Sequence, residues 1–235
     1  MHANDDQVQQ LLDKINFKSV EINENQIDLI QKISEYGAPA LNMLFEILHE
    51  RQGKAEIGPI DGLIYETLRC SSDSHIQHLL DKYFTMGIVP LKSEKNIDYD
   101  ELQQLLAKKD FLQANIVTQA KLCELAEINP KDRQWLYFTD IPTLPATDLQ
   151  TIDNLWRIYS FNRFGFSIQK QIWTSVKHDW THLLIKIKWI VNNNLCRYPQ
   201  EFIWDMTAPK GHLPLFNQLR GTQALTSLLS HKACG

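Results

Sequence analysis

Apolar residues recur every three or four positions through most of the chain, and this spacing predicts α-helices. Residues 23–37 carry three isoleucines at this spacing and stop at Gly37. Residues 38–53 restart with Pro39 in the expected first turn and stop at Gly53. Proline at the start and glycine at the end are typical helix boundaries. The pattern therefore predicts an all-α protein.

The first part of the chain continues with two more amphipathic segments, residues 58–70 and residues 73–84. Asp73 stands where the second of them needs an N-cap. Several short helices of this kind predict a small helical bundle. Residues 85–96 (TMGIVPLKSEKN) combine a glycine, a proline and a polar charged run, which is typical of a linker.

The second part also shows mainly helical periodicity. Asp98 is the expected cap of its first helix, and Pro130 is expected to end the second. A short aromatic helix is expected in the sequence QWLYFTDI. The expected helical segments are residues 98–109, 110–128, 134–141, 145–160, 167–177 and 179–191, with a last helix from about residue 213.

Two stretches of the second part do not fit a simple helix. Residues 184–191 (LIKIKWIV) alternate like a strand, but their helical flanks and the lack of a partner strand favour a helix, so we predict no sheet. Residues 192–214 form a long irregular segment with two prolines before its end. A loop of this length in a compact domain is usually functional.

Charge and aromatic content divide the chain into two domains. Residues 1–92 hold 8 Lys and Arg against 14 Asp and Glu, a net charge of −6, whereas residues 93–235 hold 16 against 14, a net charge of +2. All six tryptophans lie in the second part. We therefore predict an N-terminal helical bundle over residues 1–90 and a second all-helical domain over residues 91–235 that presents aromatic surface.

Several classes of protein lack their characteristic motifs here. The chain holds no P-loop, no GxGxxG and no GxSxG. Its four cysteines are far apart and form no CxxC, so we expect them to be reduced in a non-secretory compartment. The first residues resemble neither a signal peptide nor a transit peptide, and no apolar run reaches the length of a membrane span.

Three apparent sites carry alternative functions. His178 and His182 in HDWTH could bind zinc, but Asp179 is shorter than the glutamate of HExxH and no third ligand is evident, so two solvated histidines are favoured. His212 could be an axial haem ligand or a general base, although a lone loop histidine more often forms local hydrogen bonds. Basic residues among aromatics could bind single-stranded nucleic acid, but a domain charge of +2 is too weak to favour this.

Two further patterns could form a site for a flat, apolar acid. Residues 159–173 hold Phe161, Phe164 and Phe166 around Asn162 and Gly165, which both tolerate positive φ. This predicts a turn whose rings either line a rim or fill the core, and the pattern leaves both open.

On the helix expected from about residue 213, Asn217 and Arg220 would share one face beside Phe216. Leu215, Leu219 and Leu229 would form its inward stripe. The preceding loop supplies Tyr198, Phe202 and Trp204. A guanidinium suits a carboxylate and rings suit a planar face, but a surface arginine beside core aromatics explains the same pattern.

Four long motifs resemble one known family. DRQWLYFTDI, DLQTIDNLWRIYS, RFGFSIQKQIW and FIWDMTAPKGHLPLFNQLRG are similar to the genomes-uncoupled-four family, the porphyrin-binding activator of magnesium chelatase in oxygenic phototrophs. The resemblance covers roughly residues 95–225. The acidic front domain resembles the two-domain form of cyanobacteria and some plastid genomes. The family fold is all-α and shaped like a cupped hand, whose palm holds the porphyrin.

The resemblance assigns roles to individual residues. Phe138 and Ile141 correspond to apolar palm positions, Asn217 and Arg220 to polar rim positions, and Phe202 and Trp204 to the mobile loop over the cleft. Tyr198, also expected to contact porphyrin, stands where the family often has tryptophan. Asn162 replaces a glycine, which its tolerance of left-handed geometry permits. Gln223 stands where relatives carry a second basic residue.

The resemblance implies a non-enzymatic regulator with no catalytic residues and no metal ligands. It would bind protoporphyrin IX and Mg-protoporphyrin IX and stimulate magnesium chelatase through that enzyme's large porphyrin-binding subunit. A monomer is expected in the plastid stroma or cyanobacterial cytoplasm, with a membrane-associated fraction and no nucleic-acid partner. The alternative is a haem-binding or haem-trafficking helical protein.

Overall fold

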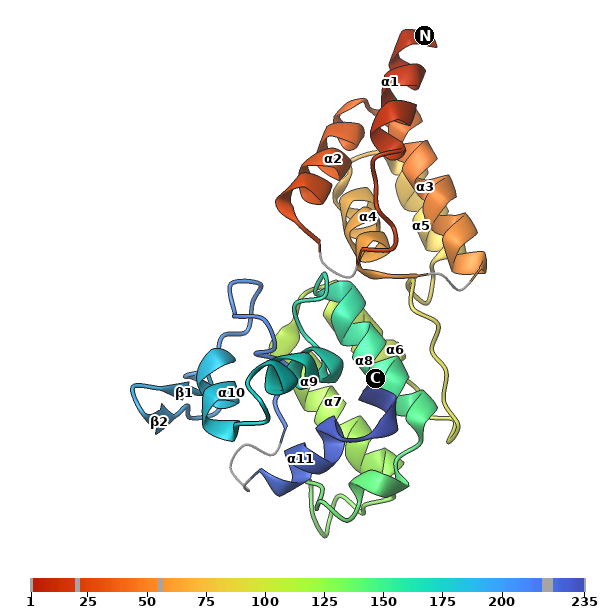
Figure 1. Cartoon of the computed structure of the whole chain (residues 1–235). Coiled ribbons are helices and arrows are strands. Elements are labelled where there is room, and N and C mark those ends of the chain that lie inside the picture. Colours follow the sequence, from red (N-terminus) through yellow and green to blue (C-terminus); the bar gives the residue numbers. More distant parts are fainter. Residues whose placement is uncertain (1, 20–21, 55–56, 217–221, 235) are drawn as a thin grey trace. The chain divides into compact units, whose positions relative to one another are not determined.

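The chain folds into two compact units, Met1–Pro90 and Leu91–Gly235 (Figure 1). The computed structural model describes residues 2–19, 22–54, 57–216 and 222–234. Both units are built from helices, which confirms the predicted all-α class. Among these described residues, the strands are limited to one small hairpin, and no helix is long and apolar enough to cross a membrane.

Five helices make up the front unit in its described residues. The predicted cap Asp73 is in place, because its side chain accepts the backbone N–H groups of His75 and Ile76, and the Asn23 side chain caps α2 by accepting the N–H of Gln26. The predicted cap Asp98 is wrong, because Tyr99 is the N-cap of the first helix of the rear unit. The first helix was not expected from its polar sequence. The helices are α1 (His2–Leu12), α2 (Glu24–Glu35), α3 (Ala38–Gly53), α4 (Pro59–Cys70) and α5 (Ser74–Tyr83).

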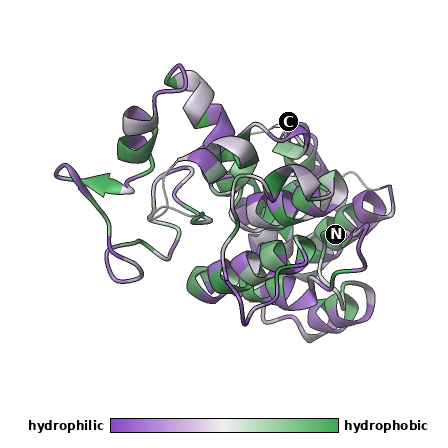
Figure 2. Ribbon diagram, turned by 90° about the horizontal axis from the view of Figure 1, so that it is seen from below, coloured by the Kyte–Doolittle hydropathy of each residue, from purple (hydrophilic) through white to green (hydrophobic). Residues whose placement is uncertain are grey.

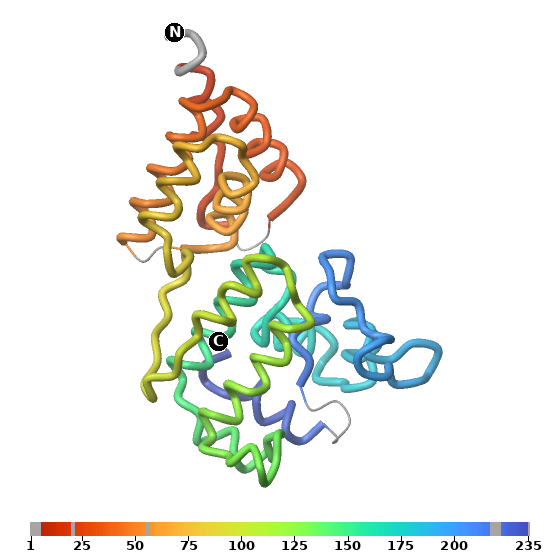
Figure 3. Tube along the Cα trace, turned by 180° about the vertical axis from the view of Figure 1, so that it is seen from behind, coloured from red at the N-terminus to blue at the C-terminus, as the bar shows by residue number. Residues whose placement is uncertain are grey.

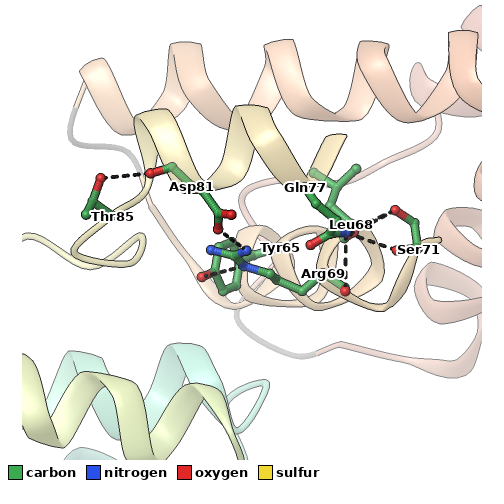
Figure 4. Close-up of polar contacts among 7 residues, drawn as sticks. All are labelled: Tyr65, Leu68, Arg69, Ser71, Gln77, Asp81 and Thr85. Atoms are coloured by element: carbon green, nitrogen blue, oxygen red, sulfur yellow. Dashed lines mark hydrogen bonds and ion pairs between the residues drawn. The ribbon is translucent and has the colours of Figure 1, made fainter. Parts of the chain in front are cut away.

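Polar side chains join α4 to α5 (Figure 4). The Arg69 guanidinium donates to the hydroxyl of Tyr65 at 3.2 Å and to the carboxylate of Asp81 at 2.6 Å. The Gln77 amide donates to the carbonyl of Leu68 at 2.8 Å, close to the end of α4. Carbonyls in the last turn of a helix have no partner within it, so Gln77 satisfies one from the next helix.

The rear unit has six α-helices, two short 3₁₀ segments and a hairpin in its described part. In Figures 1 and 3, α10 and the hairpin extend away from the bundle formed by α6 to α9. The elements are α6 (Asp100–Ala107), α7 (Phe111–Leu125), η1 (Ile141–Thr143), α8 (Ala146–Tyr159), α9 (Phe166–Ser175), α10 (Trp180–Lys186), β1 (Ile190–Val191), β2 (Asn194–Leu195), α11 (Gln223–Leu229) and η2 (Lys232–Cys234).

A buried aromatic cluster forms the centre of the rear unit. Trp156 stacks on Phe111 with ring centroids 5.9 Å apart, and Phe164 meets Phe111 edge-on at 5.2 Å. The Trp156 indole donates to Thr118 Oγ1 at 2.9 Å, so its one polar atom is satisfied. Apolar and polar faces alternate around the helices (Figure 2), as expected for surface helices that cover a core.

The short aromatic helix expected at residues 134–141 is wrong. This segment is a turn closed by Asp140, whose carboxylate accepts the N–H of Tyr137 at 2.7 Å and a guanidinium N–H of Arg133 at 2.6 Å. The same guanidinium donates to the Trp135 carbonyl at 2.7 Å. Side chains therefore occupy backbone groups that a helix would use, and only η1 follows.

The hairpin corrects the expectation that the chain has no sheet. Ile190 pairs with Leu195 in antiparallel register, and the connection is made by Asn192 and Asn193 with φ of 51° and 62°. Two consecutive residues of positive φ match the twist of a tight hairpin, and asparagine tolerates them well. The partner strand that seemed to be missing lies only three residues further along the chain.

The helix expected from about residue 213 is also wrong over residues 213–216, because α11 begins at Gln223. Partners distant in sequence bind this backbone: Leu215 N–H donates to Asn115 Oδ1 at 2.7 Å, and the carbonyl of Leu213 accepts Gly165 N–H at 3.0 Å. Within the expected stripe, Leu215 and Leu229 are buried, whereas Leu219 lies outside the described residues.

Candidate functional site

The turn between α8 and α9 has the predicted geometry. Asn162 has φ of 62° and Gly165 has φ of 137°. Phe164 and Phe166 are fully buried, so these rings fill the core instead of lining a rim. Phe161 is partly exposed, and the Lys109 ammonium lies 4.2 Å from its ring centroid.

A buried carboxylate holds the start of α9 against α8. Asp153 accepts the N–H of Ser167 at 2.9 Å and its hydroxyl at 2.6 Å. Burial raises the pKa of Asp153, and the two hydrogen bonds from Ser167 oppose that rise. These hydrogen bonds therefore fix the start of α9 relative to α8.

The first group of predicted site residues lies around η1. Phe138 is 51% exposed and Tyr137 beside it is 53% exposed, although both rings are apolar enough to be buried. Ser227 of α11 donates to the Phe138 carbonyl at 3.2 Å, and α11 packs on η1. Ile141, at the start of η1, is fully buried.

The Arg133–Asp140 pair stabilises this turn. The hydrogen bond from Arg133 holds the pKa of Asp140 below its usual range. The guanidinium also lies 4.6 Å from the Tyr137 ring centroid. One ion pair therefore shapes the turn that presents both exposed rings.

Asp140→Asn is expected to lower the free energy of unfolding by on the order of 1 kcal/mol at pH 7, the value of a partly exposed charged hydrogen bond. Urea unfolding of both proteins measures this difference. Because the folded-state pKa of Asp140 is depressed, its contribution is present above the unfolded pKa and lost as pH falls through the lower, folded value. The two proteins should therefore become equally stable in strong acid, and a gap that persists there would contradict the electrostatic origin.

The second group lies on the loop after the hairpin. Tyr198, Phe202 and Trp204 form a row, with centroids 6.0 Å apart between Tyr198 and Trp204 and 6.2 Å apart between Phe202 and Trp204. The row runs from the buried Phe202 to Tyr198, which is 40% exposed. The Trp204 indole donates to the Pro199 carbonyl at 2.8 Å, which fixes its ring. The structure thus brings the three predicted loop residues together.

His212 is fully buried and both ring nitrogens have protein partners. Nδ1 lies 2.6 Å from the Ile187 carbonyl, and Nε2 accepts the N–H of Ile203 at 3.0 Å. The carbonyl requires a proton on Nδ1, so Nε2 is the acceptor. Burial lowers the pKa of His212. In this arrangement neither nitrogen is available to ligate haem iron or to act as a general base.

The two histidines of HDWTH also have local roles. Asp179 caps α10 by accepting the N–H of His182 at 2.9 Å, and its carboxylate lies 3.0 Å from His182 Nδ1. His178 precedes the helix and meets Trp173 edge-on at 4.5 Å. Within residues 2–19, 22–54, 57–216 and 222–234, no group of three or more His, Cys, Asp or Glu could hold a metal ion.

Asn217 and Arg220 lie outside the described residues. Phe216 is buried and meets Phe166 edge-on at 6.2 Å, and its expected packing beside Arg220 lies outside the described residues. Gln223, where a second basic residue was considered, is the first residue of α11.

Sequence reasoning missed several exposed apolar residues of the rear unit. Tyr137 belongs with Phe138, and adjacency in QWLYF was the available signal. Three more lie on α10 and the hairpin, where strand-like alternation in LIKIKWIV was a signal that we interpreted as helix. They are Ile185, Val191 and Leu195, each between 46% and 47% exposed.

Fold and site together define a class of helical proteins that expose aromatic rings on two separate turns. The model of the GUN4-like family matches residues 92–232, which include both turns. The chain belongs to this family, as its motifs suggested.

Similar proteins extend the match beyond the rear unit. Protein ycf53 of Porphyra purpurea is 46% identical over 231 residues, 97% of each chain. The tetrapyrrole-binding protein, chloroplastic, of Arabidopsis thaliana is 39% identical over 144 residues, 57% of this chain and 54% of that one. The solved structure of GUN4 from Chlamydomonas reinhardtii has a TM-score of 0.59 and 41% identity, covering 63% of this chain and 96% of that chain.

Proposed function

We propose that the rear unit binds tetrapyrroles. The observation that carries this proposal is the half-exposed Phe138 and Tyr198, presented by fixed turns of a GUN4-like unit. Exposed apolar groups that lie together commonly mark a binding surface, and the exposed Tyr137 is adjacent to Phe138 in the sequence. The name of the Arabidopsis relative, a tetrapyrrole-binding protein, supports the same ligand class.

The ligands we propose are protoporphyrin IX and Mg-protoporphyrin IX. Phe138 would contact the macrocycle directly, and Ile141 would hold the turn beneath it. Phe202, Trp204 and Tyr198 would cover the other part of the ligand from the loop. Apolar contact would supply most of the affinity, at about 25 cal/mol per Å². The resemblance adds Asn217 and Arg220 as polar partners of the propionates.

We further propose that the protein is a non-enzymatic activator of magnesium chelatase. It would act as a monomer through the large porphyrin-binding subunit of that enzyme. Its place would be the plastid stroma or the cyanobacterial cytoplasm, with a fraction at membranes. A chloroplastic relative in Arabidopsis supports the plastid.

A chelatase assay tests this activity. Magnesium chelatase is mixed with protoporphyrin IX, Mg²⁺ and ATP, and Mg-protoporphyrin fluorescence is followed with and without the protein. Faster formation at limiting porphyrin is the expected result. An unchanged rate over a full concentration series would contradict the activator proposal while leaving porphyrin binding to be judged by titration.

Arg220→Ala is expected to weaken binding of acidic porphyrins by on the order of 1 kcal/mol, the value of a solvent-screened charged hydrogen bond. The loss should shrink as salt is raised. Absorbance titration with protoporphyrin IX and with its dimethyl ester measures this effect. The ester lacks carboxylates, so wild type and variant should bind it equally. Equal losses for acid and ester would show that Arg220 does not recognise the propionates.

A further inference from the structure

The loop segment of residues 198–207, which carries the aromatic row, contacts the buried imidazole of His212 through both its backbone and the Phe202 ring. His212 Nε2 accepts the N–H of Ile203 at 3.0 Å, and the Phe202 ring lies 5.6 Å from the imidazole. Ile203 stands between Phe202 and Trp204, so this bond fixes the backbone at the centre of the row.

The other hydrogen bonds that the structure gives for this segment are local. Phe202 N–H and the Trp204 indole both donate to the Pro199 carbonyl, and Asp205 accepts from Thr207. Among the described residues, the hydrogen bond from Ile203 to His212 therefore joins residues 198–207 to a residue further along the chain. These local bonds shape the segment, and the buried Phe202 ring also meets Trp189 edge-on with centroids 6.4 Å apart.

His212 itself is held firmly by its surroundings. Its carbonyl accepts the Trp189 indole N–H at 2.8 Å, and its Nδ1 donates to Ile187 at the end of α10. Gly211 just before it donates to the Arg163 carbonyl at 2.8 Å and accepts from Gln169 of α9 at 3.0 Å. The imidazole is thus a fixed point to which the segment is attached by Nε2.

We propose that His212 is a positioning residue that holds Phe202 and Trp204 in place for porphyrin, and that protonation of its Nε2 releases them. This inference rests on the proposed porphyrin binding. A protonated Nε2 is a donor that faces the N–H of Ile203, another donor, so the bond cannot form.

Nearby charges bear on the protonation of His212. Lys188, after α10, disfavours the imidazolium, and burial disfavours it more strongly. Arg163 and Lys210 add positive charge on neighbouring segments, while Asp205 is bonded to Thr207. Release is therefore expected only below the ordinary histidine range.

Two variants test the roles of the two ring nitrogens of His212 separately. His212→Gln places an amide oxygen near the position of Nε2 and keeps an acceptor for Ile203, whereas His212→Asn places an amide N–H near Nδ1 and keeps only the Ile187 bond. Hydrogen exchange of the full chain is followed in a peptide covering residues 198–207, with a peptide from α8 as the control for global opening. Protoporphyrin IX affinity is measured on the same proteins.

We expect faster exchange in residues 198–207 of His212→Asn, unchanged exchange in α8, and porphyrin affinity about five- to ten-fold weaker, consistent with the loss of one hydrogen bond. His212→Gln should keep protection and affinity near wild type. Wild type should lose protection in this peptide as pH falls below the ordinary histidine range, and His212→Gln should not.

Other outcomes would contradict the proposal. Unchanged loop exchange in His212→Asn, or a loosened loop with unchanged affinity, would overturn the positioning role. If His212→Asn opens globally, the pH series on wild type and His212→Gln decides, and parallel curves would contradict release by protonation. If wild type binds no porphyrin, the proposed function fails, while the exchange data still test the attachment of the loop.

Discussion

Gly165→Ala is expected to destabilise the rear unit by about 3 kcal/mol or more, the largest effect predicted for a single added methyl group. Gly165 has φ of 137°, a conformation nearly restricted to glycine. An added Cβ would lie 2.8 Å from Asp153 Oδ1 and 2.9 Å from Arg157 Cγ. Moving Asp153 would also disturb its two hydrogen bonds to Ser167 at the start of α9.

Thermal and urea unfolding followed by tryptophan fluorescence report on this unit, because all six tryptophans lie in it. Gln171→Ala, at an exposed position of α9, is the matched control and should change stability by less than about 0.5 kcal/mol. A Gly165→Ala protein as stable as the control would show that the α8–α9 turn relaxes without cost.

Phe138→Ala is expected to weaken the binding of protoporphyrin IX and Mg-protoporphyrin IX alike, by about ten-fold. Loss of roughly 60 Å² of apolar contact at about 25 cal/mol per Å² corresponds to this factor. The effect should not depend on the central metal, because the ring would contact the macrocycle face. Since Phe138 is half exposed, the cost in folding stability should be small, unlike that of a buried phenylalanine.

Ile116→Ala is the control, because Ile116 is a 45% exposed apolar residue on α7 in the same unit. It should leave both affinities unchanged. Circular dichroism and absorbance titrations of the three proteins measure the two effects. A loss confined to one porphyrin, or an equal loss in Ile116→Ala, would contradict contact of Phe138 with the macrocycle.

Local signals in the sequence predicted most of the helices. Gly37 and Gly53 mark where α2 and α3 stop, and Asp73 caps α5 through its own side chain. These boundaries depend on residues within one helical turn of the position. Local interactions of this kind can be predicted from the amino-acid sequence alone.

The errors occur where distant partners decide the backbone. The segment at Leu215 has helical spacing, yet Asn115, one hundred positions earlier, accepts its N–H. Arg133 and Asp140 form the turn at Tyr137 through an ion pair that spacing alone does not predict. Residues 192–195 carried a local hairpin signal in their asparagines, but a longer helical pattern competed with it.

The sequence predicted the part of the candidate site whose residues are close together along the chain. Tyr198, Phe202 and Trp204 are close in sequence and form one row in the structure. Nothing local indicated that Phe138 is exposed while Ile141, three residues away, is fully buried. The attachment of the loop to His212 also depends on packing that brings Ile187 and Ile203 to the same imidazole.

Absorbance titration of the full chain with protoporphyrin IX, Mg-protoporphyrin IX and haem, side by side, tests the central claim most directly. The account predicts saturable shifts of the Soret band for the first two, with a stoichiometry of one and quenching of tryptophan fluorescence. Haem should bind without the spectrum of histidine ligation, because both nitrogens of His212 are occupied. No saturable binding of either porphyrin, or a histidine-ligated haem spectrum that disappears in His212→Gln, would contradict it.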